Sequence, residues 1–347
     1  MKVLHLLSSN IFSGAENVAC QIIKMTSDDV EAVYCCPNGN VENSLADRGI
    51  SFLPLKKLSI SEIRRVIKEY KPDIIHAHDP RAICMAALST RKVQIIGHVH
   101  SNKPEFHSKT IVCLAFAWLI KHKNVKKIFW VSQASFDDFI FNKNKKIASK
   151  SQVLFNVIDC DEIIRKSNEK IEHEKFDISY LGRLVDAKNP ERLVEICKLL
   201  KEHKPNIKMA VIGAGELLSK CEEITKEYGL ESNIKFFGFM NNAFPILKDS
   251  KLFLMTSRYE GTPMCILEAQ TLGLPIIVPD IVDMRAVVLH GETGYFYQTN
   301  EEAKNYILDL LNNEEHRKEI AQNVQKFAVE YNDKNKYTKE ILNAYKE

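Results

Sequence analysis

Short apolar segments alternate with longer segments of mixed polarity along almost the whole chain. The apolar segments have the length of buried strands, and each segment between them can form a helix. This alternation predicts an α/β protein in which helices connect parallel strands through right-handed crossovers. The strand candidates are residues 2–7, 31–37, 50–55, 73–78, 93–100, 127–132 and 152–157, followed by 177–184, 208–215, 234–239, 252–257, 275–280 and 294–298.

The chain is long enough for two domains. Its 347 residues are 45% hydrophobic, and a charged stretch, IIRKSNEKIEHEKF at 163–176, separates the two sets of strands. We expect a first domain over residues 1–170, a second over 171–327, and a C-terminal helix over 328–347 that packs back toward the first. Two doubly wound domains that face each other leave a cleft at the carboxyl ends of their strands, where such sheets bind ligands.

Composition narrows the class of protein. The nine cysteines include no C-x-x-C pair, so neither a disulfide framework nor a thiolate zinc site is indicated, and a cytoplasmic location is expected. The start, MKVLHLLSS, reads as a strand rather than a leader. The longest apolar run, residues 110–120, has about half the length of a membrane span.

Positive charge is concentrated in the first half of the chain. Residues 52–150 contain 19 Lys and Arg against 7 Asp and Glu, whereas the whole chain has 48 against 45. The basic clusters KHKNVKK (121–127) and KNKKIASK (143–150) accompany the apolar run that contains Trp118. They can rest on an anionic membrane or near a phosphorylated acceptor, or they can be solvated helix ends. Nucleic acid is not an expected partner, because the aromatic residues follow core-like patterns.

The segment SRYEGTPMCILEAQTLGLP, residues 257–275, predicts an apolar helix that contains one carboxylate. Thr262 suits the N-cap, Pro263 the first helical position, and Gly273 the C-terminal stop. Glu268 then lies in a helix buried on most sides, so it needs hydrogen-bond donors from the protein or from a ligand. A buried Arg or a backbone amide would serve equally well. Glu260 precedes the turn, near the free N–H groups of the helix start.

Two other turns follow strand candidates. Ser13-Gly14-Ala15 leads into a helix after the first strand, and Gly14 allows a ligand to approach the backbone closely. In GRLVDAKNPERL, both Arg183 and Lys188 can reach a phosphate. Each of these cations can also be an ordinary surface residue.

The combined motifs resemble the retaining GT-B glycosyltransferases of family four (glycosyl transferases group 1), such as bacterial capsule and exopolysaccharide enzymes. The most specific part is the spacing of Glu260 and Glu268 within EGTPMCILEAQTLGLP, strengthened by GRLVDAK upstream. The resemblance extends over nearly the whole chain, through the segments SGAEN, PDIIHAHD, GHVH, FWVS, NVID, VIGAGE and FFGF. It implies a GT-B fold, with an acceptor-side first domain and a nucleotide-sugar-binding second domain.

The resemblance also implies roles for individual residues. Arg183 and Lys188 would bind the donor diphosphate, Glu268 the nucleotide ribose, and Glu260 the donor sugar. The catalytic set would be Glu260, His100, Arg183 and Lys188, with His100 contacting the sugar or diphosphate from the first domain. The remaining donor-site residues would be Gly14, near the phosphates, and Gly261, Thr262, Pro263 and Met264, whose backbone lines the site.

The implied reaction moves a sugar from a nucleotide-diphosphate sugar, expected to be a UDP-sugar, to a saccharide or lipid-linked acceptor with retention of configuration. Fixed cations and helix N–H groups would stabilise the departing diphosphate. Arg183 and Lys188 can replace a metal at the diphosphate, so the resemblance implies a reaction that needs no metal and no cofactor. Surface polysaccharide synthesis at the inner membrane face, with peripheral attachment, is the expected setting.

Some positions depart from the family pattern. Where relatives often have G-G-x-x-E, this chain has Val282, Asp283 and Ala286 in place of the two glycines and the glutamate. The segment NVID likewise has Val157 where glycine is common. The first departure changes the expected sugar and phosphate contacts, and with them the expected donor.

Four other functions are compatible with parts of the sequence. A sugar-nucleotide epimerase shares the fold, and a non-catalytic accessory subunit would keep the donor site without turnover. HAHD and HVH place His76, His78, His98 and His100 at the same-face spacing of strands, as a metal-dependent hydrolase requires. VIGAGELL begins like a dinucleotide-binding fingerprint, but Leu218 replaces its third glycine.

Overall fold

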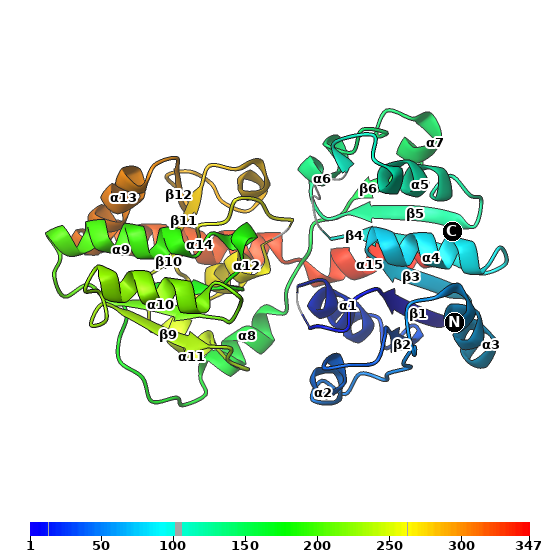
Figure 1. Cartoon of the computed structure of the whole chain (residues 1–347), viewed down its shortest axis with the longest axis horizontal. Helices are drawn as coiled ribbons and strands as arrows, with labels where there is room; N and C mark the ends of the chain where they lie inside the picture. The colour runs from blue at the N-terminus through cyan, green and yellow to red at the C-terminus, as the bar shows by residue number, and fades with distance from the viewer. Residues whose placement is uncertain (13, 101–105, 262) are drawn as a thin grey trace. The chain divides into compact units, whose positions relative to one another are not determined.

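The structure, a computed structural model, describes residues 1–12, 14–100, 106–261 and 263–347. The chain forms two compact units, one made of residues 1–156 with 334–347 and the other of residues 157–333. Each unit contains a six-stranded parallel sheet connected by helices (Figure 1). The predicted α/β class with two Rossmann-like domains is therefore confirmed.

In the first unit, β1 lies inside the sheet and the strand order is β2-β1-β3-β4-β5-β6. The strands are β1 (Lys2–Leu7), β2 (Glu31–Cys35), β3 (Ile74–His78), β4 (Gln94–Val99), β5 (Val125–Trp130) and β6 (Ser151–Val153). The helices are α1 (Gly14–Met25), α2 (Val41–Ala46), α3 (Ile60–Tyr70), α4 (Pro80–Ser89), α5 (Ile111–Leu119), α6 (Gln133–Asp137), α7 (Lys145–Ala148) and α15 (Lys334–Lys346).

One predicted strand of this unit is wrong. Residues 50–55 run beside β2 but form only isolated bridges, Tyr34 with Phe52 and Pro37 with Leu55. Leu53 and Leu55, on either side of Pro54, donate their N–H groups to the carbonyls of Tyr34 and Cys36, whereas Pro54 has no N–H and suits only the edge of a sheet. The segment is therefore an irregular border of the sheet rather than a seventh strand.

In the second unit the strand order is β12-β11-β10-β7-β8-β9, and all six predicted strands form. They are β7 (Ile178–Leu181), β8 (Met209–Ile212), β9 (Ile234–Gly238), β10 (Leu252–Leu254), β11 (Ile276–Pro279) and β12 (Gly294–Tyr297). The helices are α8 (Cys160–Ser167), α9 (Glu191–His203), α10 (Leu218–Glu227), α11 (Phe244–Lys248), α12 (Met264–Thr271), α13 (Asn300–Asn312) and α14 (Glu314–Tyr331), with 3₁₀ turns η2 (Asp186–Lys188) and η3 (Val282–Ala286).

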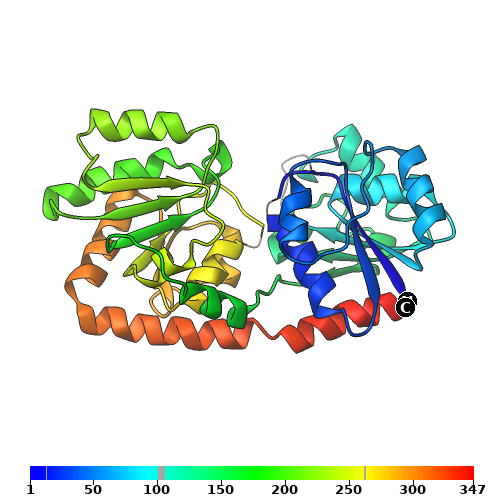
Figure 2. The ribbon, with the colours of Figure 1, turned by 90° about the horizontal axis from the view of Figure 1, so that it is seen from below.

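Most strand residues are buried, because helices cover both faces of the sheets. Every residue of β3, β8 and β11 is buried, as expected of parallel strands enclosed on both sides. In Figure 2 helices lie on either side of the second unit's sheet. Among the described residues, no helix is long and apolar enough to cross a membrane.

The boundaries of the two units along the chain differ from the predicted domain boundaries. Residues 157–170, predicted to end the first domain, lie in the second unit, where Ile158 and Ile163 join the core beside α11 and α12. At the other end, α14 belongs to the second unit and α15 to the first. The Tyr345 hydroxyl of α15 hydrogen-bonds His76 Nδ1 on β3 at 2.7 Å.

Candidate functional site

Helix α12 carries the first part of the site. It begins at Met264, with Pro263 at the N-cap, so the predicted place of Pro263 as first helical residue is wrong by one position. Thr262, the predicted N-cap, lies outside the described residues. The predicted stop is confirmed, since Gly273 follows the helix with φ of 78°. The side chain of Pro263 does not cap α12, and the N–H groups at the start of a helix attract anions.

Lys188 and Glu260 lie together in the second unit. Lys188 ends η2, and its ammonium donates to both carboxylate oxygens of Glu260. The hydroxyl of Ser257 donates to the same carboxylate at 2.6 Å. Because Glu260 is only 8% exposed, these contacts compensate the cost of burying its charge.

The fold brings this pair together through neighbouring strands. Strands β7 and β10 are adjacent and parallel, so the loops at their carboxyl ends leave the sheet side by side. The Arg258 backbone N–H donates to the carbonyl of Ala187 at 2.9 Å, and the Thr256 hydroxyl donates to the carbonyl of Lys188 at 2.9 Å. The two loops are therefore joined directly on either side of the ion pair.

Arg183 lies in the same β7 loop but does not join the ion pair. Its side chain is exposed, with no hydrogen-bond or ion-pair partner in the described part of the chain. The backbone beside it is fixed, since the Leu184 N–H donates to the carbonyl of Ala214 at 3.0 Å. The guanidinium is thus free to meet a ligand.

The glycines of VIGAGELL have a structural explanation. A Cβ at Gly213 would overlap the carbonyl oxygen of Gly182, and one at Gly215 would overlap that of Leu184. These glycines let the β8 loop pack against the Arg183 loop. A dinucleotide fingerprint is therefore not needed to explain this sequence.

Glu268 lies on α12, and its side chain is half-buried. Burial raises the pKa of its carboxyl to about 7, an effect that the charge of Lys166 opposes. In the described part of the chain, no donor hydrogen-bonds this carboxylate. The alternative in which Glu268 pairs with a buried Arg or a backbone amide therefore finds no partner among these residues.

Asp283 belongs to the site but was not predicted. It lies in η3 with 7% of its surface exposed, and its Oδ2 accepts from the Glu260 backbone N–H at 3.4 Å. The departure from the family glycines was the only sequence signal at this position. That signal did not reveal which residue the carboxylate contacts, because the contact joins loops more than twenty residues apart.

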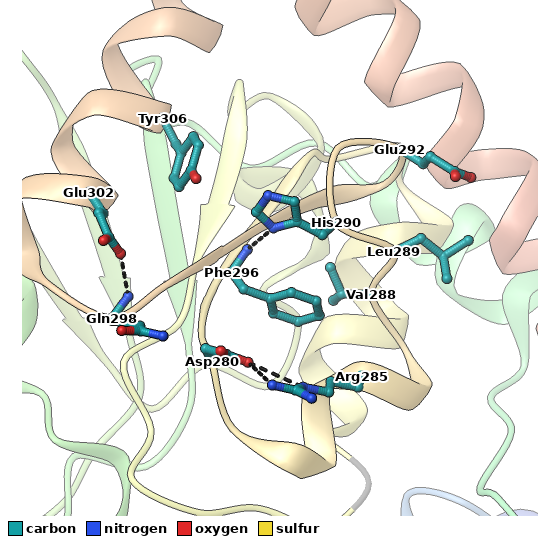
Figure 3. A pocket seen from close by; sticks show the side chains of 10 residues that line it. All are labelled: Asp280, Arg285, Val288, Leu289, His290, Glu292, Phe296, Gln298, Glu302 and Tyr306. Atoms are coloured by element: carbon teal, nitrogen blue, oxygen red, sulfur yellow. Dashed lines mark hydrogen bonds and ion pairs between the residues drawn. The ribbon is translucent and has the colours of Figure 1, made fainter.

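A cavity of about 680 Å³ lies beside η3 and β12 (Figure 3). Arg285 donates to Asp280 at 2.9 Å across its floor, and this contact lowers the pKa of the Asp280 carboxyl. Phe296 and Tyr306 supply aromatic surface. The side chains of Lys188, Glu260 and Glu268 do not line this cavity, so it is separate from the ion pair.

In the first unit, His100 belongs to a cluster of buried histidines. His78 hydrogen-bonds His5 through Nε2 and His100 through Nδ1, each at 2.9 Å. His76 and His98 stack beside them. Burial lowers the pKa of all five, to about 3 for His5 and His100, so the cluster is neutral near pH 7.

Two triads of this cluster can present metal ligands, His5 with His76 and His78, and His78 with His98 and His100, with ligand atoms within 4.8 Å of one another. Neighbouring rings hydrogen-bond each other, whereas Nε2 of His5 and Nε2 of His98 are buried without a partner in the described chain. Nδ1 of His100 is buried without a partner in the described chain, so it remains available to a ligand.

Gly14 is the first residue of α1. A Cβ at this position would meet no atom within 4 Å. No described protein contact therefore requires glycine here, and its predicted proximity to donor phosphates remains a prediction.

Two Rossmann-like units, the second with a cation and carboxylates at the carboxyl ends of its strands, define the GT-B class of glycosyltransferases. Residues 12–162 match the family described as Glycosyltransferase Family 4, and residues 161–327 match the one described as Glycosyl transferases group 1. The chain therefore belongs to the group 1 and family 4 glycosyltransferases.

Individual proteins agree with this family. An uncharacterized glycosyltransferase of Methanocaldococcus jannaschii is 28% identical over 240 residues, which make up 63% of this chain and 58% of that protein. The UDP-Gal:alpha-D-GlcNAc-diphosphoundecaprenol alpha-1,3-galactosyltransferase of Escherichia coli is 26% identical over 337 residues, 87% of this chain and 85% of that protein. The crystal structure of Anabaena Alr3699/HepE in complex with UDP-glucose has a TM-score of 0.85 at 20% identity, covering 99% of this chain and 98% of that one.

Proposed function

We propose that this protein transfers a sugar from a UDP-sugar to a saccharide or lipid-linked acceptor during synthesis of a surface polysaccharide, with retention of configuration and without a metal. The E. coli relative uses a UDP-sugar and a diphosphoundecaprenol-linked acceptor by name, which supports this substrate class. The Anabaena protein of the same fold binds UDP-glucose, which supports the donor.

Glu268 carries the proposal. A half-buried carboxylate whose pKa is raised to about 7, and which lacks a described protein donor, is costly for a fold to keep. The two adjacent hydroxyls of a ribose supply the missing donors. A largely apolar helix keeps this residue because the donor nucleotide, rather than the protein core, supplies its hydrogen-bond donors.

The cations suit a departing diphosphate. An ammonium has three donors, so Lys188 can hold both oxygens of Glu260 and still donate to a phosphate oxygen. The exposed guanidinium of Arg183 can bind two phosphate oxygens at once. Together with the N–H groups at the start of α12, these cations would stabilise the negative charge that grows on the diphosphate as the bond to the sugar breaks.

Glu260 and the phosphate have separate tasks in this mechanism. The carboxylate of Glu260, held by Lys188 and Ser257, accepts hydrogen bonds from sugar hydroxyls and fixes the orientation of the reacting carbon. The acceptor attacks from the face that the diphosphate leaves, and a phosphate oxygen takes the acceptor proton. No enzymic nucleophile is required.

The test is a screen of nucleotide sugars by thermal stabilisation, followed by reaction with lipid-linked and soluble saccharide acceptors in the presence of a strong chelator. NMR of the product gives the anomeric configuration. Formation of a retained glycoside with chelator present supports the proposal. Interconversion of the donor sugar without an acceptor would indicate an epimerase. Donor binding without turnover would indicate an accessory subunit. Activity that is lost with chelator and restored only by a divalent ion would contradict metal independence.

A further inference from the structure

Helix α5 of the first unit, labelled in Figure 1, exposes several apolar side chains. Ile111 is 86% exposed, Val112 61% and Trp118 56%. Leu114 and Ala115 are exposed between them. We call these five residues the α5 face. Large apolar side chains gathered on one helix face differ from the scattered exposed residues of an ordinary surface, and they indicate an interaction site.

The opposite side of α5 fixes the helix in place. Cys113, Phe116 and Leu119 are buried in the core of the first unit. The ring of Phe116 contacts the rings of Trp130 and Phe139 edge to face. The α5 face is therefore presented by a rigidly packed helix.

Lysines predominate in the segments that precede and follow α5 in the sequence. Residues 106–150 contain nine lysines but only two carboxylates, Asp137 and Asp138; the lysines are Lys109, Lys121, Lys123, Lys126, Lys127, Lys143, Lys145, Lys146 and Lys150. The ring of Trp118 contacts that of His122 with centroids 4.8 Å apart. Burial and the neighbouring charges of Arg91, Lys150 and Lys146 lower the pKa of His122, so the positive charge reaches the edge of the face.

We propose that the α5 face is a docking surface for an anionic lipid bilayer, with the apolar side chains inserted at the headgroup boundary and the lysines on lipid phosphates. A helix of nine residues cannot cross the hydrocarbon layer but can lie in its interface. Tryptophan beside lysine is the combination favoured at that boundary.

Charge distinguishes the bilayer from other occupants. A second copy of this chain on the same face would bring two lysine clusters together, and their repulsion opposes such a dimer. An anionic bilayer instead gains about 1 kcal/mol for each lysine near its surface. This surface does not depend on the proposed sugar transfer, and its test needs no nucleotide sugar.

The two tryptophans give a direct measurement, because Trp118 is exposed and Trp130 is fully buried. Vesicles of phosphatidylcholine with phosphatidylglycerol, added to the full chain at low salt, should shift the tryptophan emission to shorter wavelength. The same vesicles should sediment the protein, and added salt should release it. Trp118→Phe should abolish the emission shift while sedimentation remains.

The decisive variant is Ile111→Ser/Val112→Ser, which should weaken binding to anionic vesicles by about tenfold or more. Val329→Ser, at a valine 75% exposed on α14, is the matched control and should bind as the parent does. Lys145→Glu/Lys146→Glu tests the role of positive charge at two exposed positions, where the fold should be retained. This variant should also bind anionic vesicles more weakly.

Three results would overturn the proposal. The first is an unchanged Trp118 emission on anionic vesicles, and the second is sedimentation with pure phosphatidylcholine vesicles equal to that with anionic vesicles. The third is that Ile111→Ser/Val112→Ser converts a dimer into a monomer while vesicle binding persists. Thermal unfolding of each variant identifies any loss of fold. UDP binding by the variants is measured separately, so failure of membrane docking is distinguishable from failure of the proposed function.

Discussion

Lys188 donates to both carboxylate oxygens of Glu260, and the two residues belong to loops at the ends of adjacent strands. The pair therefore couples the proposed phosphate contact to the proposed sugar contact. A donor that engages the ammonium through its diphosphate also meets the carboxylate that orients its sugar.

Replacing one member of this pair should lower the free energy of unfolding more than replacing both charged groups. Lys188→Met leaves the buried Glu260 carboxylate without its cation, and we expect a loss of about 2 to 4 kcal/mol in the free energy of unfolding. Lys188→Met/Glu260→Gln should recover much of that loss. Urea unfolding of the parent, both single variants and the double variant gives a double-mutant cycle. If the two single losses of unfolding free energy add up to the loss in the double variant, the two side chains do not interact.

The two glutamates should affect different constants. Glu268→Gln should weaken UDP binding by about 1.5 to 3 kcal/mol, typical of a hydrogen bond to a charged group. Glu260→Gln should lower turnover strongly and leave UDP affinity nearly unchanged, because its proposed partner is the transferred sugar. Calorimetry with UDP and steady-state kinetics with the intact donor measure both. Equal behaviour of parent and variants would contradict the donor-site assignment.

UDP affinity should also depend on pH through Glu268. The pKa of this carboxyl is raised to about 7, and the proposed ribose contact requires the ionised form. Affinity for UDP should therefore fall as the pH decreases below about 7 in the parent, and it should fall less in Glu268→Gln. Calorimetry between pH 6 and 8, about one unit on either side of that pKa, tests this. An identical pH profile for parent and variant would exclude Glu268 as the titrating group.

Glu268→Gln should make the unliganded protein more stable at high pH. The folded-state pKa of about 7 lies above the ordinary value of 4.5, so the unfolded chain ionises first as the pH rises. The parent therefore loses stability between those two pH values, by up to about 3 kcal/mol, and the loss persists above them. Thermal unfolding should show no gain for the variant at pH 4.5 and a clear gain at about pH 8. A variant that is less stable at both would indicate a structural partner for Glu268.

The histidine cluster should make the protein sensitive to acid. Folding lowers the pKa of His5 from 6.5 to about 3, so the neutral form stabilises the fold above 6.5 and that contribution is lost as the pH falls toward 3. Each such histidine should remove about 1.4 kcal/mol of unfolding free energy per pH unit in that range. His5→Gln should reduce the slope by one proton in urea titrations at several pH values. An unchanged slope would show that His5 does not contribute.

The sequence by itself determined the alternation of strands and helices, because the period of apolar positions is a local property. The same periodicity placed Arg183, Lys188 and Glu260 directly after strands, and parallel strands place such residues at one edge of a sheet. It also determined the stop at Gly273, since a left-handed residue there favours glycine. Segment 50–55 shows the limit of this reasoning: its pattern suits a strand, but its pairing depends on where Pro54 falls beside β2.

Tertiary structure decided the contacts between distant segments. Three such features depend on which elements pack together. They are the hydrogen bond between Asp283 and Glu260, the hydrogen bond between Tyr345 and His76, and the exposure of the α5 face. Sequence spacing does not encode these distances, because each joins residues through the packing of a whole unit. The apolar run at 110–120 illustrates the difference: its composition gave no division between a buried and an exposed side, and only packing against the core turned Phe116 inward and left Trp118 outside.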